Sequence, residues 1–419
     1  MDFDDTPEET AFREEARSWL AAHAERLAPG ERGYTLAEWR SRENGLAEAK
    51  AWMATKADDG WACITWPVEY GGRGASSIQN VIFGQEEARH RVPPNMFTIG
   101  QGMLGPTLMA HGTPAQKTRY LRPLLRADEI WCQLFSEPDA GSDLAALRTS
   151  AVRDGDAWVI DGQKIWTSGA QYSQWGMVIT RTDPSVPKHA GLTYFIVDMQ
   201  SPGILIRPIR QMNGAVGFNE VFFDGVRIPD ANRIGAVGDG WRGALTTLMN
   251  ERSTIGSGGG AAGVGVHDLM QLARETDWAG RRALDDPSVR QRIAEFYIRA
   301  KGAQYTGYRT LTALSRGQTP GPESSIGKLV GAALRQDMAS FACDLLGAAG
   351  TLTDLDGAGG AGAWQDLLLS APGGRLAGGT DEVMRNIIAE RVLRLPPEIR
   401  VDKDRAFSDV PTGRGASRA

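Results

Sequence analysis

Three glycines in the first third of the chain have the spacing of a dinucleotide-binding loop. Gly100, Gly102 and Gly105 form a Gly-x-Gly-x-x-Gly pattern, in which bare backbone could approach a pyrophosphate. That chemistry needs a strand before the glycines and a helix after them, but here the pattern follows Pro93-Pro94. We therefore interpret these glycines as points where a helix makes a close contact.

Other familiar arrangements for catalysis or metal binding are missing from the sequence. There is no Walker A sequence and no Gly-x-Ser-x-Gly elbow, so P-loop phosphoryl transfer and α/β-hydrolase chemistry lack their usual support. The five histidines show no metal-ligand spacing, and Cys63, Cys132 and Cys343 form no Cys-x-x-Cys pair. We predict no metal site and no disulfide framework, and we expect each cysteine to be a buried, reduced thiol.

Composition narrows the class of protein. The 419 residues are 42% hydrophobic and carry a formal charge of −5, which suits two or three globular domains and argues against binding to nucleic acid. No apolar run approaches the roughly 20 residues that a membrane-spanning helix needs. The first residues, MDFDDTPEETAF, are acidic where a signal peptide would be basic and then apolar. We predict a cytoplasmic protein without an integral membrane segment.

Helical periodicity dominates both ends of the chain. A capping box at Thr6 and Glu9, with Pro7 at the first helical position, predicts an amphipathic helix over residues 6–28. The other predicted helices span residues 36–59, 78–89, 103–111, 114–125, 241–255, 267–276, 289–316, 326–346 and 381–395.

Between these helices the pattern changes to short β-rich runs, from about residue 130 to residue 229. Asp154-Gly155, Asp161-Gly162 and Asp224-Gly225 each predict a hairpin turn. The fold class is thus α+β. The predicted domains are an N-terminal helical domain at 1–130, a middle β-domain at 131–235, a C-terminal helical domain at 236–396 and a tail at 397–419.

Several motifs resemble those of the acyl-CoA dehydrogenase family. They are SEPDAGSD (136–143), DGQKIWTSGA (161–170), FNEVFFDGVRIP (218–229), GDGWRGALTTLMNERSTIGSG (238–258) and AGGTDEVMRNIIAERVL (377–393). They follow the family's order over roughly residues 5–396, and the AGGT variant resembles a bacterial branch. The resemblance implies a helical domain, a β-domain and a C-terminal four-helix domain, with FAD held between the last two and usually completed by a second subunit of a homodimer or homotetramer.

The resemblance also implies which residues bind FAD. Those along the isoalloxazine ring would be Gln133, Leu134, Phe135 and Ser136. Ser142 would lie near the pyrophosphate and the acyl-CoA, while Trp166, Thr167 and Ser168 would cover the other side of the ring. The alternative is structural, with the Trp166 ring packing the sheet and Ser136 serving a turn.

A dehydrogenase of this kind needs a base for the α-proton of the acyl thioester. The best-known members place a glutamate immediately before Gly-Thr in the C-terminal motif, where this chain has Gly378. Branched-chain and long-chain members take the base from the helix that opens the C-terminal domain, and the matching residue is Glu251, whose small and apolar neighbours favour a raised pKa. The alternative is a surface Glu251 paired with Arg252 or Arg242.

The AGGT segment has a different predicted role. The backbone N–H groups of Gly378 and Gly379 would bind the thioester carbonyl together with a flavin ribityl hydroxyl. Thr380 and Glu382, at the start of the next helix, would lie near the cofactor, with Glu382 complementing the helix dipole. Further candidate substrate contacts are Met249, Asn250 and Arg252.

The part of the FAD site that a second subunit would complete matches the family less well. Arg274 resembles an arginine that contacts the FAD pyrophosphate across the dimer, but Asp277-Trp278 follows it where an aromatic residue and glycine are expected. Asp344 stands where the family has glutamine. This departure leaves a heterotetramer of two related subunits open.

The predicted function is FAD-dependent oxidation of an acyl-CoA to the trans-2-enoyl-CoA in lipid catabolism, with electrons passed to an electron-transfer flavoprotein. One alternative is a flavin oxidase or monooxygenase of the same fold, and another is a non-catalytic subunit of a heteromeric enzyme. The glycine-rich segment 257–265 favours a long, branched or ring-bearing acyl chain, unless its glycines serve close helix packing.

Overall fold

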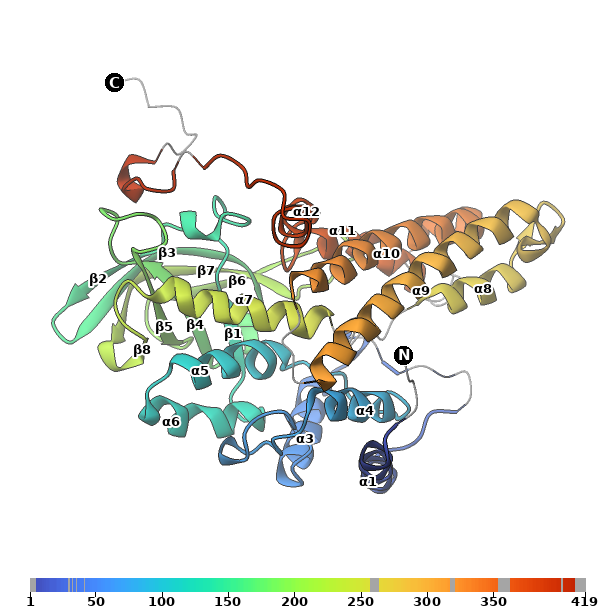
Figure 1. Ribbon diagram of the computed structural model, residues 1–419, viewed down its shortest axis with the longest axis horizontal. Coiled ribbons are helices and arrows are strands. Elements are labelled where there is room, and N and C mark those ends of the chain that lie inside the picture. The colour runs from blue at the N-terminus through green and yellow to red at the C-terminus, as the bar shows by residue number, and fades with distance from the viewer. Residues whose placement is uncertain are drawn as a thin grey trace.

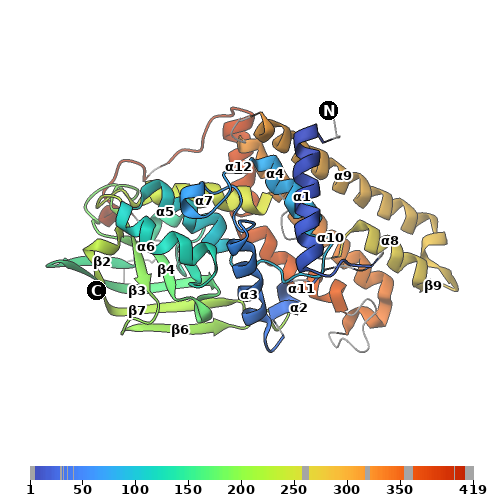
Figure 2. The same ribbon diagram turned by 90° about the horizontal axis from the view of Figure 1, so that it is seen from below.

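The computed structural model arranges the chain as two groups of helices and one β-domain (Figure 1). Helices α3 to α6 lie beneath the sheet and the centre of the molecule, α8 to α11 extend away from the sheet, and α7 runs between these parts. Figure 2 shows the same division from below. The structure describes residues 5–28, 31, 33–34, 36–40, 42–256, 264–316, 321–352, 362–400 and 402–410.

The helices begin and end close to most of the predicted limits. They are α1 (Pro7–His23), α2 (Leu36–Arg40), α3 (Gly45–Asp58), α4 (Ser77–Glu87), α5 (Gly105–His111), α6 (Pro114–Leu125), α7 (Gly240–Gly256), α8 (Val266–Glu275), α9 (Pro287–Ser315), α10 (Ser325–Leu346), α11 (Ala363–Leu376) and α12 (Asp381–Ile387).

Helix α1 forms as its sequence predicts but ends earlier. Thr6 accepts from the backbone N–H of Glu9 while the Glu9 carboxylate accepts from the N–H of Thr6, which completes the capping box. Phe12, Ala16 and Leu20, each four residues apart, are its buried face. The predicted extension to residue 28 is wrong, because the backbone becomes extended at Ala24.

Two other helix predictions need correction. Residues 36–59 form two helices, because the Trp39 indole donates to the carbonyl of Gly45 where the second begins. A Cβ on Gly45 would lie 2.3 Å from the Trp39 carbonyl oxygen. At the other end, α12 stops at Ile387 and a π-helical turn, Ile388–Val392, replaces the predicted continuation.

The glycine pattern at 100–105 is a packing feature, as predicted. Gly100–Leu104 is a π-helical turn that leads directly into α5. A Cβ on Gly105 would lie 2.3 Å from the Trp66 ring, so only glycine allows this approach.

The β-domain is one sheet in the order β6-β7-β3-β2-β4-β5-β8, with β1 pairing in parallel with β4. The strands are β1 (Trp131–Leu134), β2 (Ser150–Asp154), β3 (Ala157–Ser168), β4 (Trp175–Arg181), β5 (Leu192–Asp198), β6 (Ile204–Ile209), β7 (Phe218–Pro229) and β8 (Arg233–Ile234). A separate hairpin in the helical part joins β9 (Asp277–Trp278) and β10 (Arg281–Arg282).

Only one of the three predicted hairpin turns is present. Asp154-Gly155 connects β2 to β3, but Asp161-Gly162 lies inside β3 and Asp224-Gly225 lies inside β7. These two pairs face each other where the β3–β7 register shifts, and the N–H of Gly225 donates to Asp161 at 2.7 Å. Glycines inside strands here mark a β-bulge and not a turn.

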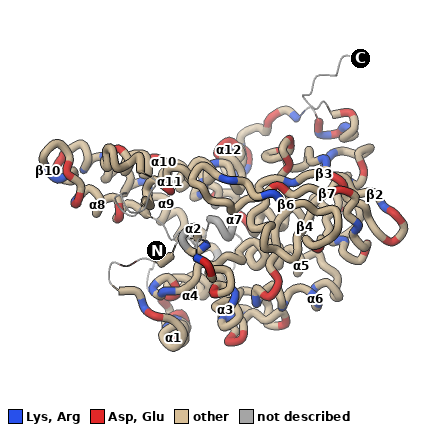
Figure 3. Tube along the Cα trace, turned by 180° about the vertical axis from the view of Figure 1, so that it is seen from behind, with Lys and Arg blue, Asp and Glu red and all other residues tan. Residues whose placement is uncertain are grey.

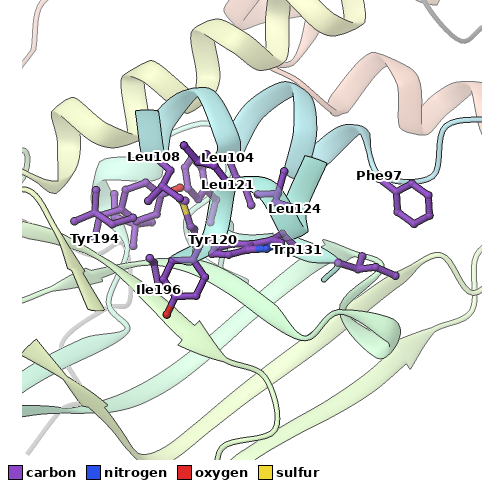
Figure 4. Packing of buried hydrophobic residues seen from close by; sticks show 14 of the residues in the cluster. Phe97, Leu104, Leu108, Tyr120, Leu121, Leu124, Trp131, Tyr194 and Ile196 are labelled. Carbon is purple, nitrogen blue, oxygen red and sulfur yellow. The ribbon is translucent and has the colours of Figure 1, made fainter. Parts of the chain in front are cut away.

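A shared hydrophobic core joins the N-terminal helices to the sheet. Figure 4 shows Leu104, Leu108, Leu121 and Leu124 from the helices lying above Tyr194 and Ile196 of β5 and Trp131 of β1. All of these side chains are buried. The α5 and α6 helices therefore fix the position of β1.

The segment 402–410 packs on the β-domain. Phe407 is buried, with its ring 3.7 Å from the Arg181 guanidinium and its N–H donating to the carbonyl of Val186. Lys188 lies between Asp402 and Asp143, at 2.5 and 2.7 Å. This segment thus ties the 183–190 connection to the loop that contains Asp143.

Surface and cysteine properties were also predicted. Acidic and basic residues are interspersed along the trace (Figure 3). Within the described ranges, no helix combines the length and apolar character required to cross a membrane.

All three cysteines are free thiols. Burial raises the pKa of both Cys63 and Cys132 to about 12, although the Cys63 residue as a whole keeps some exposed surface. Cys343 is only partly buried, so the burial prediction is wrong for this residue.

Candidate active site

The structure brings Gln133 and Glu251 together, although 118 positions separate them in the sequence. Gln133 lies on β1, and its Nε2 donates to Glu251 Oε2 at 3.4 Å. Glu251 lies on α7, and both side chains are half-buried. A carboxylate in this setting retains access to a ligand while the adjoining helices and sheet limit its movement.

Buried hydroxyl groups hold α7 in place one turn before Glu251. The Thr247 hydroxyl is 2.8 Å from the Thr107 hydroxyl of α5 and 3.3 Å from the Tyr194 hydroxyl of β5. Burial raises the pKa of Tyr194, and the negative charge of Glu251 raises it further. Hydrogen bonds therefore link α7 to both the N-terminal helices and the sheet at the level of the candidate base.

The other predicted residues of α7 differ in accessibility. Met249 is 55% exposed, while Asn250 is half-buried and its Nδ2 donates to the carbonyl of Thr246 at 2.9 Å. The side chain of Arg252 lies outside the part of the chain that the structure describes, as do residues 257–263. Arg242 pairs with Asp239 at 2.8 Å.

Trp166 has the geometry of a ligand-facing side chain. It lies near the end of β3, where the register with β7 shifts, and its φ is +60°, which is costly for a residue with a bulky side chain. The ring is 55% exposed and meets the Phe218 ring edge to face at 6.0 Å. One part of the ring thus contacts the sheet, while more than half of its surface stays open to a ligand.

The two hydroxyl-bearing residues that follow Trp166 bear on whether this region suits a flavin. Thr167 is buried, and its Oγ1 has no hydrogen-bond partner among the described residues. Ser168 is half-buried beside it. Because the Thr167 hydroxyl is inaccessible, it faces the interior of the sheet and not an open ligand site. The exposed aromatic face of Trp166 and the partly exposed Ser168 fit a flat, polar-edged group such as the isoalloxazine ring.

A buried ion pair shapes the SEPDAGSD loop. Glu137 accepts from the Lys164 ammonium at 2.8 Å and from the backbone N–H groups of Arg148 and Thr149 at 2.6 and 2.9 Å. Burial alone would raise the pKa of Glu137, but Lys164 and these donors hold it below the usual value. Lys164 also donates to the carbonyl of Phe135 at 3.0 Å. Sequence reasoning missed this pair, although two charged residues inside otherwise β-rich motifs were a usable signal.

The ion pair orders the other candidate residues after β1. Leu134 and Phe135 are buried, the Phe135 ring packs edge to face on Tyr194, and Ser136 accepts through its carbonyl from Ile165 N–H at 2.8 Å. Ser142 is exposed at the tip of the loop.

The AGGT segment forms a tight turn before α12. Gly378 and Gly379 have φ of +66° and +97°, which glycine adopts without steric cost. Thr380 caps α12 by accepting from Val383 N–H at 3.2 Å. Glu382 is exposed and lies 3.6 Å from Arg385. Helix α10 packs against both α7 and α12, which connects the turn to the helix that carries Glu251.

The structure does not bring Arg274 to the other candidates. It is exposed on α8, where its guanidinium donates to Gln271 at 3.3 Å. Both ribbon views place α8 at the end of the molecule farthest from the β-domain. Asp277-Trp278 forms the exposed strand β9, and Asp344 is exposed near the end of α10.

Family models now account for most of the chain. The acyl-CoA dehydrogenase N-terminal, middle and C-terminal domains match residues 6–128, 132–226 and 238–393. The chain belongs to the acyl-CoA dehydrogenase family. Members of this family are FAD-dependent flavoproteins, so the protein is an oxidoreductase that acts on CH–CH groups and binds FAD.

Relatives of this acyl-CoA dehydrogenase span nearly its full length. It is 40% identical over 398 residues to acyl-CoA dehydrogenase IpdE1 of Mycobacterium tuberculosis, covering 93% of this chain and 98% of that protein. Among solved structures, the Tcur3481-Tcur3483 steroid ACAD has a TM-score of 0.77, and the ChsE4-ChsE5 complex from Mycobacterium tuberculosis has a TM-score of 0.75. Each is 30% identical to this chain and covers 95% of it and 100% of the matched chain.

Proposed function

We propose that this acyl-CoA dehydrogenase uses Glu251 to remove the α-proton of an acyl-CoA thioester, giving the trans-2-enoyl-CoA. Bound FAD supplies the hydride acceptor for the β-carbon. The contact between Glu251 and Gln133 carries the proposal, because it sets a half-buried carboxylate beside the strand that begins the flavin-facing residues. Gly378 cannot replace it as the base, since it has no side chain.

The proposed roles of the other residues follow from their positions. Trp166 covers the flavin, and Ser168 donates near its reactive edge, while the segment from Gln133 to Ser136 borders the opposite edge. The backbone donors of Gly378 and Gly379 bind the thioester carbonyl. Further proposed ligand contacts are Thr167, Ser142, Arg274, Thr380 and Glu382 for FAD and Ser142, Met249, Asn250 and Arg252 for the acyl-CoA.

The proposed substrate is an acyl-CoA with a bulky, ring-bearing acyl group. The similarity to a structure described as a steroid ACAD supports this class. Turnover of a panel containing butyryl-CoA, palmitoyl-CoA and a CoA thioester with a steroid side chain, measured with an artificial electron acceptor, tests it. A preference for butyryl-CoA would contradict the substrate class without affecting the reaction type.

The proposed electron acceptor is an electron-transfer flavoprotein. Reduced enzyme should be reoxidised slowly by air and rapidly by that partner. Rapid oxidation by air would favour an oxidase or monooxygenase instead.

The proposed assembly contains at least two subunits in the cytoplasm, with Arg274 reaching the FAD of a neighbouring subunit. The ChsE4-ChsE5 structure is a complex of two named components, so a heteromer is the second candidate. Purification of this chain alone discriminates between the two. A yellow, active oligomer supports a homomer, whereas a stable protein that gains flavin and activity only with a related subunit supports a heteromer.

Anaerobic addition of acyl-CoA tests the central proposal. The purified holoenzyme should lose its flavin absorbance as the flavin is reduced. A correctly folded, FAD-loaded oligomer that no acyl-CoA in the panel can reduce would contradict the proposed function.

A further inference from the structure

A lysine ammonium lies directly against the two-glycine turn. Lys328 is near the start of α10, and its Nζ donates to the carbonyl of Gly379 at 2.5 Å and to the carbonyl of Arg375 at 3.0 Å. Its side chain is only 11% exposed. One cation thus holds two carbonyl groups on either side of Gly378.

A buried carboxylate balances this cation. Asp381, the first residue of α12, has one oxygen 3.7 Å from Lys328 Nζ and accepts from Arg375 Nε at 2.6 Å through the other. Arg375 also donates to Gln336 of α10 at 3.1 Å. The Lys328, Arg375 and Asp381 side chains therefore tie α10, the end of α11 and the start of α12 into one charged cluster.

The turn itself needs such support. Two consecutive glycines have more backbone freedom to lose than any other pair of residues, so their N–H groups are poorly fixed by local geometry alone. A charged hydrogen bond to the Gly379 carbonyl fixes the Gly379–Thr380 peptide plane, and the bond to the Arg375 carbonyl holds the chain before the turn. The N–H groups of Gly378 and Gly379 lie between these two held points, and Lys328 does not use them, so they can donate to a ligand oxygen.

The charge of Lys328 has a second effect. A positive group close behind the turn favours the negative charge that a thioester oxygen gains as the α-proton leaves. Burial lowers the pKa of Lys328, whereas Asp381 opposes that change. The Glu382 carboxylate also raises the pKa of Lys328, as Asp381 does, whereas the Arg375 guanidinium lowers it, as burial does.

We propose that Lys328 is a positioning residue for the dehydrogenation, which holds the Gly378–Gly379 turn so that its backbone donors meet the thioester carbonyl. This inference rests on the proposed function, because it needs the thioester to bind at that turn.

The test compares Lys328→Met and Lys328→Gln with a matched control, Lys50→Met. Lys50 also donates to a backbone carbonyl, that of Asp128 at 3.1 Å, but in the N-terminal domain. We expect both Lys328 variants to bind FAD and acyl-CoA, with kcat lowered about 10- to 100-fold and KM changed little, since small misplacement of reacting groups costs rates of this order. The control should retain the parent kcat.

A spectroscopic measurement separates positioning from general stability. The trans-2-enoyl-CoA product of the best substrate in the turnover panel, labelled with ¹³C at the thioester carbonyl, is bound to each holoenzyme at saturation, and the carbonyl stretch is recorded by infrared difference spectroscopy. The parent should lower the frequency relative to water, because the turn polarises the carbonyl, and the Lys328 variants should return it towards the value in water. Lys328→Arg, which keeps the charge, should recover part of the shift.

The outcomes are distinct. A parent enzyme that leaves the carbonyl frequency unchanged contradicts the proposed binding of the thioester at the turn. A parent shift that persists unaltered in both Lys328 variants overturns only the role of Lys328. Failure of both variants to fold also overturns it, because Lys328 would then serve overall stability.

Discussion

The two helices that flank the candidate site each carry a glutamate, but in opposite settings. Glu251 lies on α7, which hydrogen bonds tie to α5 and β5 through Thr247, and its carboxylate meets Gln133. Glu382 lies on the short α12 with a side chain that is 75% exposed. The difference agrees with the proposal that α7 contributes a side chain to the chemistry, whereas the α12 region contributes backbone N–H groups.

The largest effect is expected when the α7 carboxylate is removed. Glu251→Gln keeps the size of the side chain but lacks its basicity, so flavin reduction should slow by about 100- to 10,000-fold, the usual contribution of a general base. Stopped-flow absorbance of the flavin measures the rate, and FAD content should equal that of the parent. Reduction at the parental rate would remove Glu251 from the mechanism.

The next effect concerns the backbone of the α12 region. Gly379→Ala places a Cβ at φ +97°, which strains the turn, and 2.5 Å from the Met384 methyl group, which must move aside. We expect kcat to fall by at least tenfold, since loss of one well-placed donor to a developing oxyanion costs about 100- to 1,000-fold. Gly214→Ala is the control, because Gly214 also has a positive φ but no atom within 4 Å of the added Cβ. Equal loss of activity in both variants would contradict a specific role for the AGGT turn.

A smaller effect is expected from the helix cap. Thr380→Ala removes the acceptor for Val383 N–H, and the loss of such a cap costs about 1 kcal/mol. Thermal unfolding should shift by a few degrees at most. The carbonyl frequency of bound enoyl-CoA should change less than in Gly379→Ala, and a larger change would mean that the cap, and not the glycine turn, sets the donor geometry.

The smallest effect is expected for the exposed glutamate. Glu382→Gln removes a carboxylate whose ion-pair partner among the described residues is Arg385 of its own helix, at 3.6 Å. Such exposed pairs contribute little to stability. Steady-state kcat should stay within about twofold of the parent, and a loss comparable to that of Glu251→Gln would reverse the comparison between the two helices.

Local sequence signals predicted the elements well where local interactions decide them. The capping box at Thr6 and Glu9 fixed the start of α1, and the Asp154-Gly155 turn joined its two strands as predicted. The turns predicted at Asp161-Gly162 and Asp224-Gly225 are absent, because a β-bulge between distant strands uses the same residue types as a turn.

The contacts within the candidate site could likewise not be predicted from local sequence signals. Family motifs pointed to Gln133 and Glu251 separately, but their contact depends on how α7 crosses β1. Lys328 belongs to no motif that the sequence analysis used, because its partners are carbonyl groups, which every residue possesses. Contacts to backbone carry no residue-type signal, so only the folded arrangement reveals them.

The segment 402–410 also determines the order in which the molecule can be completed during synthesis. It is translated after every element that it contacts, including Arg181 beneath the Phe407 ring and Lys188 between Asp402 and Asp143. Until residues 402–410 have left the ribosome, the loop that contains Asp143 lacks this cover. The nascent β-domain therefore reaches its mature packing on this side only after that segment emerges, well after the strands themselves have been made.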